Sequence, residues 1–529
     1  MSREQQLIDF LSKAESYPYK PEYIKIIQTH ISIIAIAPPY VYKFKKSINF
    51  GFIDYSSLEK RRQNVFKEFT LNKRLCDEIY EEIIKVYIEN NRFSFEKGEL
   101  FEYGIKMKYL KTENCLQEIT KSGRLTQNHI ELLANCLRGF YKNLKPDFSG
   151  FGSAQVVQNA VLDNFKVVNN LLDEEDLFKT KYIYNYSTNY FDTHKEFIQK
   201  RLHDGWIRDC HGDLRLEHIY LQNSELNKSV CIYDCIEFND NFRFIDIASD
   251  LAFLAMDLDY HEKPRESNRL AKLVLLDEND SSLRELFRFY KCYRAYVRVK
   301  VNMLRASEPE VPDDEKKNSI NEAKKYLALC FRYALLPEKP VAILVMGKVG
   351  TGKTTVARYI ADSFTIPHLN SDYIRKSLAQ LDPYKPSCEE ARKELYSPEQ
   401  TQKTYNSLLQ KTVQTLKQGS PAVIDATFSK KEVRKNFMEA FHKEGFSCII
   451  IETTTNSEII ESRLKHRPNE KNNTSDATHT EKELMDASYE PPTELQEQHR
   501  TDFMTVDTSS ADAGEWQEAL FHCLKKALL

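Results

Sequence analysis

The pattern of hydrophobic and polar positions in the first part of the chain changes from strand-like to helical. Residues 31–46 are rich in Ile, Val and Tyr and are broken by two prolines, which predicts two strands. Residues 56–79 begin with Ser and carry apolar residues at helical spacing, which predicts a capped helix. Residues 100–110 alternate like a strand, whereas residues 124–205 and 286–306 have helical patterns. Strands followed mainly by helices predict a small sheet lobe and a larger helical lobe.

The second part of the chain has a different pattern. Residues 341–347, 421–428 and 447–455 are short apolar runs with helical patterns between them. This alternation predicts an α/β domain built on a parallel sheet. Before it, residues 306–319 are polar and acidic, and residues 320–336 have the pattern of a helix. We therefore expect a boundary between two domains in this region.

The length and charge of the chain agree with this division. A chain of 529 residues is too long for one ordinary core, so we predict a first domain over residues 1–305, a linker with a connecting helix over 306–339 and a second domain over 340–529. The net charge of −3 supplies no general attraction for a polyanion. Nucleic-acid binding would need a local basic patch, so a nucleic-acid partner is possible but not favoured.

The cysteines and apolar runs indicate the environment of the protein. The eleven cysteines are scattered, and the closest pair, Cys231 and Cys235, lies in an apolar run, which favours reduced, buried thiols over disulfides or a zinc site. No apolar run reaches the roughly 20 residues that span a bilayer. The first twenty residues carry acids and no signal-peptide core. We expect a cytoplasmic protein without a membrane partner, and the sequence does not indicate its oligomeric state.

The sequence GKVGTGKT over residues 347–354 matches the P-loop pattern GxxxxGK[ST] in full, directly after an apolar run and before a helical pattern. In such a loop, backbone N–H groups cradle phosphate oxygens, Lys353 reaches the β- and γ-phosphates and Thr354 ligates Mg²⁺. We therefore expect ATP and Mg²⁺ as cofactors. The predicted nucleotide-binding residues are Gly347, Gly350, Thr351, Gly352, Lys353, Thr354 and Thr355.

Five polar residues farther along are candidates for chemistry beside this loop. Asp372, at the predicted end of the second strand, can accept a proton from an attacking hydroxyl, and Arg375 can hold an acceptor phosphate or carboxylate. Asp425 is a Walker-B-like candidate for contact with Mg²⁺. Arg463 and Arg467, about one helical turn apart, fit a lid that closes on transferred phosphate. Each feature also has a structural explanation, as a helix cap, a buried carboxylate or a solvated basic helix face.

In combination with the P-loop, these residues resemble the small P-loop kinases of the polynucleotide-kinase and zeta-toxin group, the AAA-33 ATPases. The resemblance covers roughly residues 340–510 and includes NSDYIRK at 370–376, IDAT at 424–427 and SDA at 475–477. No arginine-finger and sensor layout of a ring-forming motor is evident, which indicates a monofunctional kinase fold and not a mechanical ATPase.

The sequence HGDLRLEH over residues 211–218 resembles HGDLxxxN, the catalytic loop of aminoglycoside-phosphotransferase-like kinases. The resemblance covers about residues 25–305. With the P-loop half, the chain resembles the two-domain proteins described as bifunctional aminoglycoside phosphotransferase/ATP-binding proteins. The resemblance implies an α+β bilobal, protein-kinase-like domain followed by an α/β P-loop kinase domain.

The same resemblance implies roles for four residues of the first domain. Asp213 accepts the proton of the substrate hydroxyl, and Asp234 binds Mg²⁺. Lys43 holds the α- and β-phosphates and is oriented by Glu68. A base, a metal-bound carboxylate and a cation clamp are also the groups that phosphoryl transfer requires on physical grounds. Lys45 lies on the same strand face as Lys43 and is an alternative to it.

His218 stands where kinases of this kind have Asn. An imidazole nitrogen suits softer metals than an amide oxygen does. The first site therefore uses His218 as a metal ligand, relies on Glu217 or Glu237 instead, or is inactive. We expect Asp246 and Asp250 to hold the catalytic loop together. No acidic cluster marks a pocket for a polycationic aminoglycoside, so the sequence does not identify an antibiotic-resistance enzyme.

Three functional hypotheses follow. The leading one is a phosphotransferase with two nucleotide sites, which transfers the γ-phosphate of Mg·ATP to a hydroxyl of a small metabolite or nucleotide-like acceptor. In the second, the first domain is a pseudokinase that regulates an active P-loop kinase. The third is a nucleic-acid end kinase. For the Tyr-, Lys- and Arg-rich helix at residues 290–300, we favour an ordinary amphipathic packing role over a grip on RNA.

Overall fold

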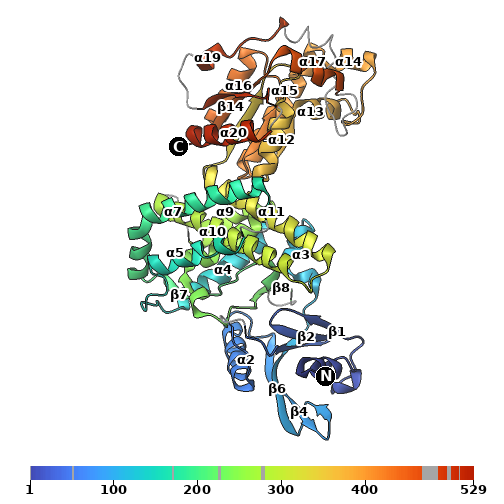
Figure 1. Cartoon of the computed structure of the whole chain (residues 1–529), viewed down its shortest axis with the longest axis vertical. Coiled ribbons are helices and arrows are strands. Elements are labelled where there is room, and N and C mark those ends of the chain that lie inside the picture. The colour runs from blue at the N-terminus through green and yellow to red at the C-terminus, as the bar shows by residue number, and fades with distance from the viewer. Residues whose placement is uncertain are drawn as a thin grey trace. The chain divides into compact units, whose positions relative to one another are not determined.

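Figure 1 shows the computed structural model of the chain. It describes residues 2–49, 53–168, 172–223, 228–275, 280–466, 487–496, 502–510 and 513–528. The chain forms two compact units, of which the first contains Met1–Asn164 and Ser187–Arg294, and the second Phe165–Tyr186 and Ala295–Leu529. The predicted linker over 306–339 lies in the second unit. Compact units and functional domains need not coincide, so the domain limits stay a prediction.

The first unit begins with a six-stranded antiparallel sheet in the order β1-β2-β3-β6-β4-β5. The strands predicted within residues 31–46 and 100–110 are present as β2, β3 and β6, whereas β1, β4 and β5 were not predicted. The bounds are β1 Lys25–Gln28, β2 Ser32–Ala37, β3 Tyr40–Lys45, β4 Tyr80–Glu89, β5 Arg92–Ser94 and β6 Glu99–Lys108.

Successive side chains of β3 point to opposite faces of the sheet, with aromatic residues on one face and lysines on the other. Tyr42 and Phe44 join the apolar cluster that packs against α1 (Arg3–Leu11), so Lys43 and Lys45 point to the opposite face. Helix α2 (Leu58–Asn72) contacts strands β3, β4 and β6 and brings Glu68 to both lysines. As predicted, a Ser caps this helix, but the helix ends at Asn72 and not at residue 79.

The remainder of the first unit is mainly helical. Its helices are α3 Leu116–Lys121, α4 Gln127–Asn143, α5 Ala154–Leu162, part of α7 Glu174–His203, α8 Ile247–Tyr260, α9 Pro264–Val274 and part of α10 Ser281–Ser307. Two short antiparallel pairs join β7 Ile207–Asp209 to β10 Phe244–Asp246, and β8 Ile219–Asn223 to β9 Lys228–Ile232. The loop at residues 210–218 therefore connects β7 to β8, and Asp234 follows β9. The predicted α+β arrangement, a sheet followed by a mainly helical part, is present.

The second unit contains a five-stranded, all-parallel sheet in the order β12-β13-β11-β14-β15. The bounds are β11 Val341–Met346, β12 His368–Asn370, β13 Ala422–Asp425, β14 Ser447–Thr454 and β15 Phe503–Asp507. Every residue of the central strand β11 is buried, as the apolar run predicted. The predicted α/β fold class of this part is confirmed.

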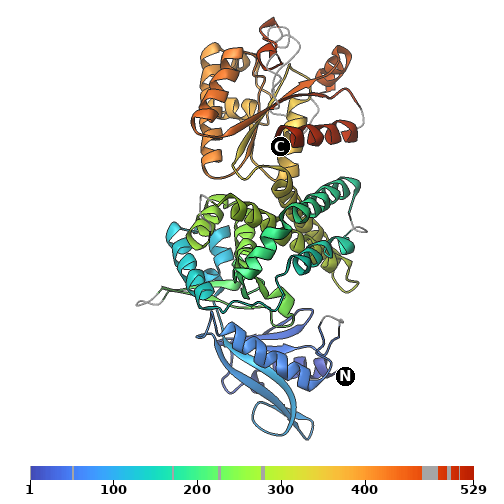
Figure 2. The same cartoon turned by 90° about the vertical axis from the view of Figure 1, so that its left-hand side faces the viewer.

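Helices cover both faces of this sheet (Figure 2). On one face, Leu344 of β11 packs with Leu408 of α15 and Phe437 of α16. On the other, α12 contacts β11 and β13, and Phe364 of α12 lies 5.2 Å from Phe331 of α11 between ring centroids. This aromatic contact explains why the helix expected as a connection belongs to the second unit. The helices are α11 Asp313–Leu335, α12 Lys353–Phe364, α13 Ser371–Leu378, α14 Glu389–Leu395, α15 Pro398–Lys417, α16 Lys431–Lys443, α17 Ser457–His466, α19 Thr493–Gln496 and α20 Ala513–Leu528.

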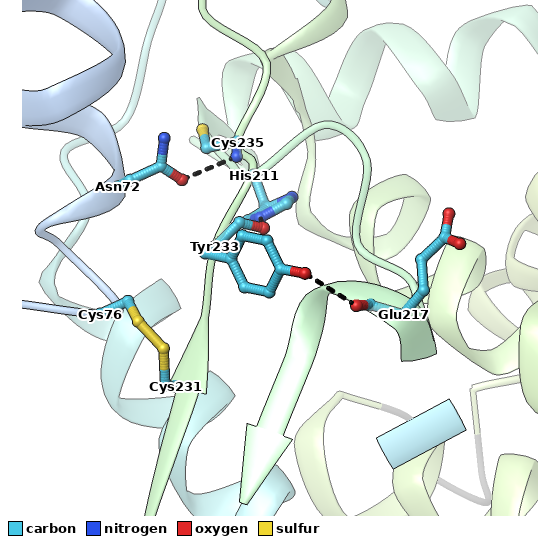
Figure 3. Close-up of a disulfide and its surroundings, with 7 residues drawn as sticks. All are labelled: Asn72, Cys76, His211, Glu217, Cys231, Tyr233 and Cys235. Carbon is cyan, nitrogen blue, oxygen red and sulfur yellow. Dashed lines mark hydrogen bonds between the residues drawn. A yellow bond between two sulfur atoms is a disulfide. The ribbon is translucent and has the colours of Figure 1, made fainter. Parts of the chain in front are cut away.

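Cys76 and Cys231 form a disulfide (Figure 3), with their Cα atoms 4.7 Å apart and 155 positions between them in the sequence. The expectation that all thiols are reduced is therefore wrong for this pair. The N–H of Ile232 donates to the carbonyl of Leu75 over 3.2 Å, and this bond holds the two segments together. Such a long-range contact leaves no signal in the spacing of cysteines. Among the described residues, no helix is both long and apolar enough to cross a membrane.

Candidate active sites

In the first unit, the loop that carries Asp213 is held by a buried carboxylate. Asp250 on α8 accepts hydrogen bonds from the backbone N–H groups of Gly212 (2.8 Å) and His211 (3.3 Å). Asp246 instead caps α8. Neither carboxylate contacts the side chain of Asp213 among the described interactions, so both have structural positions.

His211 connects this loop to the segment that carries Asp234. Its Nε2–H donates to the carbonyl of Tyr233 (3.0 Å), since a carbonyl can only accept, and its Nδ1 accepts from the N–H of Asp213 (3.3 Å). Burial lowers the pKa of His211 below its usual value. The ring is therefore a neutral tautomer with both nitrogens satisfied.

Arg215 is a site residue that the sequence analysis did not single out. Its Nε lies 2.9 Å and its Nη2 3.3 Å from the two carboxylate oxygens of Asp213, and it also pairs with Glu217. The guanidinium is buried, whereas the Asp213 carboxylate is 26% exposed and open to a hydroxyl. The sequence signal that could have identified Arg215 was its position two residues after Asp213, the predicted base. A fixed cation here can stabilise charge near the transferred group.

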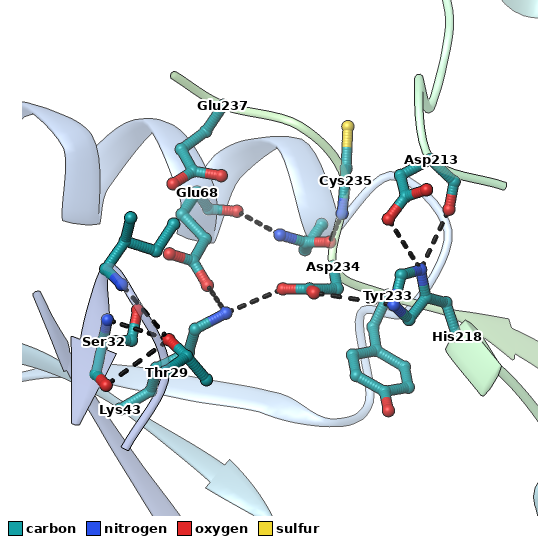
Figure 4. Close-up of polar contacts among 12 residues, drawn as sticks. Thr29, Ser32, Lys43, Glu68, Asp213, His218, Tyr233, Asp234, Cys235 and Glu237 are labelled. Carbon is teal, nitrogen blue, oxygen red and sulfur yellow. Dashed lines mark hydrogen bonds and ion pairs between the residues drawn. The ribbon is translucent and has the colours of Figure 1, made fainter. Parts of the chain in front are cut away.

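Lys43 joins two carboxylates from distant parts of the chain (Figure 4). Its Nζ lies 2.8 Å from Oε1 of Glu68 and 2.7 Å from Oδ1 of Asp234. Burial by itself would raise the pKa of Asp234, but the charge of Lys43 holds it well below its usual range. The Asp234 carboxylate is therefore ionised, as a metal ligand must be.

The backbone of Asp234 is also unusual. Its φ of +64° lies in the left-handed region, which is uncommon for residues other than glycine. Such a conformation costs on the order of 1 kcal/mol and persists only where the surrounding structure imposes it. Here the hydrogen bond from the N–H of Cys235 to Oδ1 of Asn72 (2.8 Å) fixes the next residue.

Lys45, the alternative phosphate-binding lysine, has a different environment. Its Nζ lies 2.5 Å from Oε2 of Glu68 and pairs with Glu237, which also accepts from the hydroxyl of Tyr55 (3.0 Å). Lys45 is almost fully buried. Lys45 therefore neutralises buried carboxylates. Lys43 contacts Asp234, and this contact favours Lys43 as the phosphate-binding residue.

His218 lies close to both Asp213 and Asp234. Its Nδ1–H donates to the backbone carbonyl of Asp213 (2.9 Å), and its Nε2 lies 3.7 Å from both Oδ2 of Asp234 and Oε1 of Glu217. Within the described part of the chain, no three His, Cys, Asp or Glu residues are arranged as a metal site. A kinase metal takes several ligands from phosphates and water, so a pair of protein ligands is compatible with Mg²⁺ or a similar ion.

In the second unit, the loop between β11 and α12 has the shape of a phosphate cradle. Gly347, Gly350 and Gly352 have φ values of +143°, +84° and +87°. A Cβ on Gly347 would lie 2.6 Å from the carbonyl oxygen of Thr453, and one on Gly350 would lie 2.9 Å from a side-chain carbon of Ile460. The loop can therefore be built only with glycine, and it leads into the N-terminus of a helix, where anions bind.

The predicted polar residues of the loop occupy distinct positions. The hydroxyl of Thr351 is bonded to Thr453 Oγ1 (2.7 Å) and is structural. Lys353 Nζ donates to the carbonyl of Lys348 (2.8 Å), across the loop that would hold the phosphates. Thr354 is half-buried and Thr355 is exposed. The side chain of Thr354 hydrogen-bonds to Asp425, so its hydroxyl and this carboxylate are adjacent.

Asp425 ends β13 beside this loop and is buried. Its Oδ2 accepts from Nδ2 of Asn370 (2.6 Å) and lies 3.4 Å from Nε2 of His368. Burial would raise the pKa of Asp425, but His368, Lys353 and Thr354 together hold it below its usual value. An ionised carboxylate near the hydroxyl of Thr354 fits a Mg²⁺ site built from oxygen ligands.

Asp372 lies in the first turn of α13, which Asn370 caps by accepting from the N–H of Tyr373 (2.8 Å). Its Oδ1 is 3.5 Å from the hydroxyl of Tyr396. The side chain is 22% exposed. Its predicted role as a base for an acceptor hydroxyl stays a prediction.

Arg375 is buried and already bonded within the unit. Its Nη1 donates to the carbonyl of Leu395 (3.0 Å) and to Oγ1 of Thr401 (3.1 Å), and its guanidinium lies 4.7 Å from the ring centroid of Tyr396. These contacts tie α13 to α14 and α15. Oδ1 of Asp372 lies 3.8 Å from Nε of Arg375, which is too long for a hydrogen bond, and binding of an acceptor by Arg375 stays untested.

Arg463 on α17 lies directly beside the nucleotide loop. Its Nη1 donates to the carbonyl of Gly350 (3.3 Å) and to Oγ1 of Thr508 (3.0 Å), and its Nη2 donates to the carbonyl of Thr508 (2.7 Å). Arg467 and residues 475–477 lie outside the described residues, so the predicted pair of lid arginines is not tested.

The tyrosine-rich stretch of α10 is used for packing. Tyr290 and Arg294 are buried, and Arg294 donates to the carbonyls of Ser249 (3.3 Å) and Gly212 (3.4 Å). Lys291 pairs with Asp259 (2.9 Å). These side chains are committed to the interior of the first unit.

The chain is similar to several known proteins. The chain is 25% identical over 426 residues to uncharacterized proteins of Mycobacterium bovis and Mycobacterium tuberculosis, which covers 79% of this chain and 82% of theirs. A spectinomycin phosphotransferase in complex with ADP and spectinomycin is 14% identical, with a TM-score of 0.35, over 62% of this chain and 98% of that one. A gluconokinase from Sinorhizobium meliloti is 15% identical, with a TM-score of 0.27, over 36% of this chain and 95% of that one. Residues 343–492 match the family AAA_33, described as an AAA domain, and the second unit therefore carries an AAA_33 P-loop domain, as the sequence predicted.

Proposed function

We propose that this chain is an ATP-dependent phosphotransferase with two nucleotide sites, one in each unit. The observation that carries the proposal is the position of Lys43 Nζ, which lies within 2.8 Å of carboxylate oxygens of both Glu68 and Asp234. A lysine ordered by a buried glutamate beside an ionised aspartate is the arrangement that positions ATP phosphates in kinases. Asp213, whose carboxylate is partly exposed, lies on the loop at residues 210–218 and can act as the base.

In the first site, each residue has a distinct part. Lys43 holds the α- and β-phosphates, and Glu68 keeps its ammonium in place. A divalent cation, when bound, supplies the positive charge that the phosphate oxygens require, and Asp234 is its carboxylate ligand. Asp213 accepts the proton of the acceptor hydroxyl, and Arg215 fixes the orientation of that carboxylate.

In the second site, the loop at residues 347–354 holds the triphosphate. Lys353 contacts the β- and γ-phosphates, and Thr354 and Asp425 hold Mg²⁺ through oxygen atoms. Asp372 is the base at the end of the neighbouring strand. The acceptor at either site is a hydroxyl of a small metabolite or of a nucleotide-like molecule.

A second function, favoured by His218, makes the first unit a nucleotide-binding regulator without transfer activity. His218 lies between Asp213 and Asp234, where an Asn would give a hard oxygen ligand. Against it, Asp213 is accessible and Lys43, Glu68 and Asp234 are already assembled. The third hypothesis, a nucleic-acid end kinase, receives no support from α10, where Tyr290 and Arg294 are buried and Lys291 pairs with Asp259.

Transfer to an acceptor tests the proposal directly. The protein is incubated with ATP, Mg²⁺ or Mn²⁺ and a panel of hydroxylated metabolites, nucleosides and RNA ends, and products are detected by mass spectrometry. A phosphorylated product that Asp213→Asn abolishes supports transfer in the first unit. Nucleotide binding to the first unit, with every product insensitive to Asp213→Asn, would favour the regulatory function.

A further inference from the structure

The first site offers a cation both oxygen and nitrogen donors. Asp234 contributes a carboxylate oxygen, and the neighbouring donor is the imidazole nitrogen of His218. In the second unit, Nε2 of His368 likewise lies 3.4 Å from Oδ2 of Asp425. Oxygen donors suit Mg²⁺, whereas transition-metal ions also accept imidazole.

The tautomer of His218 leaves the relevant nitrogen able to bind a metal. The backbone carbonyl of Asp213 can only accept, so the 2.9 Å hydrogen bond to it places a proton on Nδ1. In the neutral ring, Nε2 then carries a lone pair. A metal-binding histidine typically donates its other N–H to a backbone carbonyl or carboxylate in this way.

The distance between the two donors is suited to a shared ion. His218 Nε2 and Asp234 Oδ2 are 3.7 Å apart, which is too long for a hydrogen bond. It is also shorter than two metal–ligand bonds of about 2.1 Å each, so one ion can contact both atoms. The other oxygen of Asp234 is occupied by Lys43, so Oδ2 is the oxygen that faces the ring.

The surrounding charges also favour a cation at this position. The carboxylates of Asp213, Glu217 and Asp234 face the ring, with Nδ1 3.7 Å from Oδ2 of Asp213 and Nε2 3.7 Å from Oε1 of Glu217. Arg215 and Lys43 each offset part of this negative charge. His218 is nearly buried and so cannot swing freely into solvent.

We propose that His218 and Asp234 together bind a divalent transition-metal ion in the first site. The remaining ligands are phosphate oxygens and water, which agrees with the lack of a three-residue metal cluster in the described part of the chain. The inference rests on the proposed function of the first unit as a nucleotide site.

Mn²⁺ is the probe, because its electron spin reports a directly bound nitrogen. The full chain carrying Lys353→Ala, which weakens nucleotide binding in the second unit, and His368→Gln, which removes the imidazole beside Asp425, is loaded with Mn²⁺ and a non-hydrolysable ATP analogue. Pulsed electron paramagnetic resonance is recorded on protein with natural histidine and with ¹⁵N-labelled histidine. We expect a nitrogen modulation that changes from the ¹⁴N to the ¹⁵N pattern, which adenine nitrogens cannot produce.

His218→Asn is the matched variant, since an amide can still donate to the carbonyl of Asp213 while offering oxygen to the metal. We expect the histidine signal to disappear and the ratio of Asp213-dependent turnover with Mn²⁺ to that with Mg²⁺ to fall by about tenfold or more. Bound Mn²⁺ that gives no histidine signal in the protein with native His218 would overturn the inference, whatever the His218→Asn variant does.

The outcomes separate this inference from the proposed function. Asp213-dependent transfer with Mg²⁺ and no histidine signal leaves the phosphotransferase standing and contradicts the metal assignment. A histidine signal without Asp213-dependent transfer in any metal supports the metal assignment and contradicts transfer in the first unit. The isotope experiment uses the native His218, so it remains decisive even if His218→Asn does not fold.

Discussion

Lys43 Nζ lies 2.7 Å from Oδ1 of Asp234, although 191 positions separate the two residues in the sequence. The contact joins strand β3 to the segment after β9 and forms the centre of the first site. It also distinguishes Lys43 from Lys45, which is two residues away on the same strand face but pairs with Glu68 and Glu237.

Substitution of the two lysines should therefore have different effects. We expect Lys43→Ala to remove Asp213-dependent turnover, because the phosphates lose their cation. We expect Lys45→Ala to lower the free energy of unfolding by roughly 3 to 5 kcal/mol, because it leaves buried carboxylates without a partner. Turnover and urea unfolding are measured for both variants. Retained turnover in Lys43→Ala, with turnover lost in a stably folded Lys45→Ala, would reverse the assignment.

The nucleotide loop should not tolerate a side chain at Gly347. A Cβ there would meet the carbonyl of Thr453 at 2.6 Å, so Gly347→Ala must distort the loop, and we expect it to abolish nucleotide binding in the second unit. Gly445→Ala is the matched control, since Gly445 also has a positive φ, +76°, but has no atom within 4 Å of an added Cβ. Binding is measured by calorimetry with an ATP analogue. Equal binding by both variants would show that this loop does not hold the phosphates.

His211 predicts a dependence of stability on pH. Burial lowers its pKa in the folded state, so below about pH 6.5 the unfolded chain binds more protons and stability falls as the pH decreases. The slope from this group is at most about 1.4 kcal/mol per pH unit. His211→Gln should remove this slope, whereas His203→Gln, at an exposed position, should keep it. Urea unfolding as a function of pH makes the comparison, and identical slopes in all three proteins would contradict a buried neutral His211.

The disulfide closes a loop of 155 positions and should stabilise the first unit. We expect a reducing agent, Cys76→Ser, Cys231→Ser and the double variant each to lower the free energy of unfolding by a similar amount, roughly 2 to 5 kcal/mol. The double variant should show no further loss and no response to the reducing agent. Wild-type stability that is unchanged by reduction would mean that the two thiols are not bonded in solution.

The sequence was most informative where the chemistry lies in contiguous residues. The P-loop, the Gly347, Gly350 and Gly352 positions and the apolar strand before them could all be predicted, because a local backbone shape dictates the residues. The role of Asp234 could be predicted only from a family resemblance, because its partner Lys43 is far away in the sequence.

Other features depend on contacts that no local pattern records. The Cys76–Cys231 bond arises because β9 runs beside the segment after α2. Arg215 was missed because a charged residue after a predicted base looks like any surface cation, and only its burial against Asp213 reveals it. The placement of residues 165–186 and α11 in the second unit follows from packing such as that of Phe178 and Phe364 against Phe331.

The central claim is that one chain holds two independent phosphotransfer sites. Release and transfer of labelled γ-phosphate from ATP, compared among wild type, Asp213→Ala, Lys353→Ala and the double variant, tests it most directly. The account predicts that each single substitution removes a separate part of the turnover and that the double variant removes all of it. If Lys353→Ala abolishes all turnover while Asp213→Ala changes nothing, the first unit does not transfer phosphate and the claim is wrong.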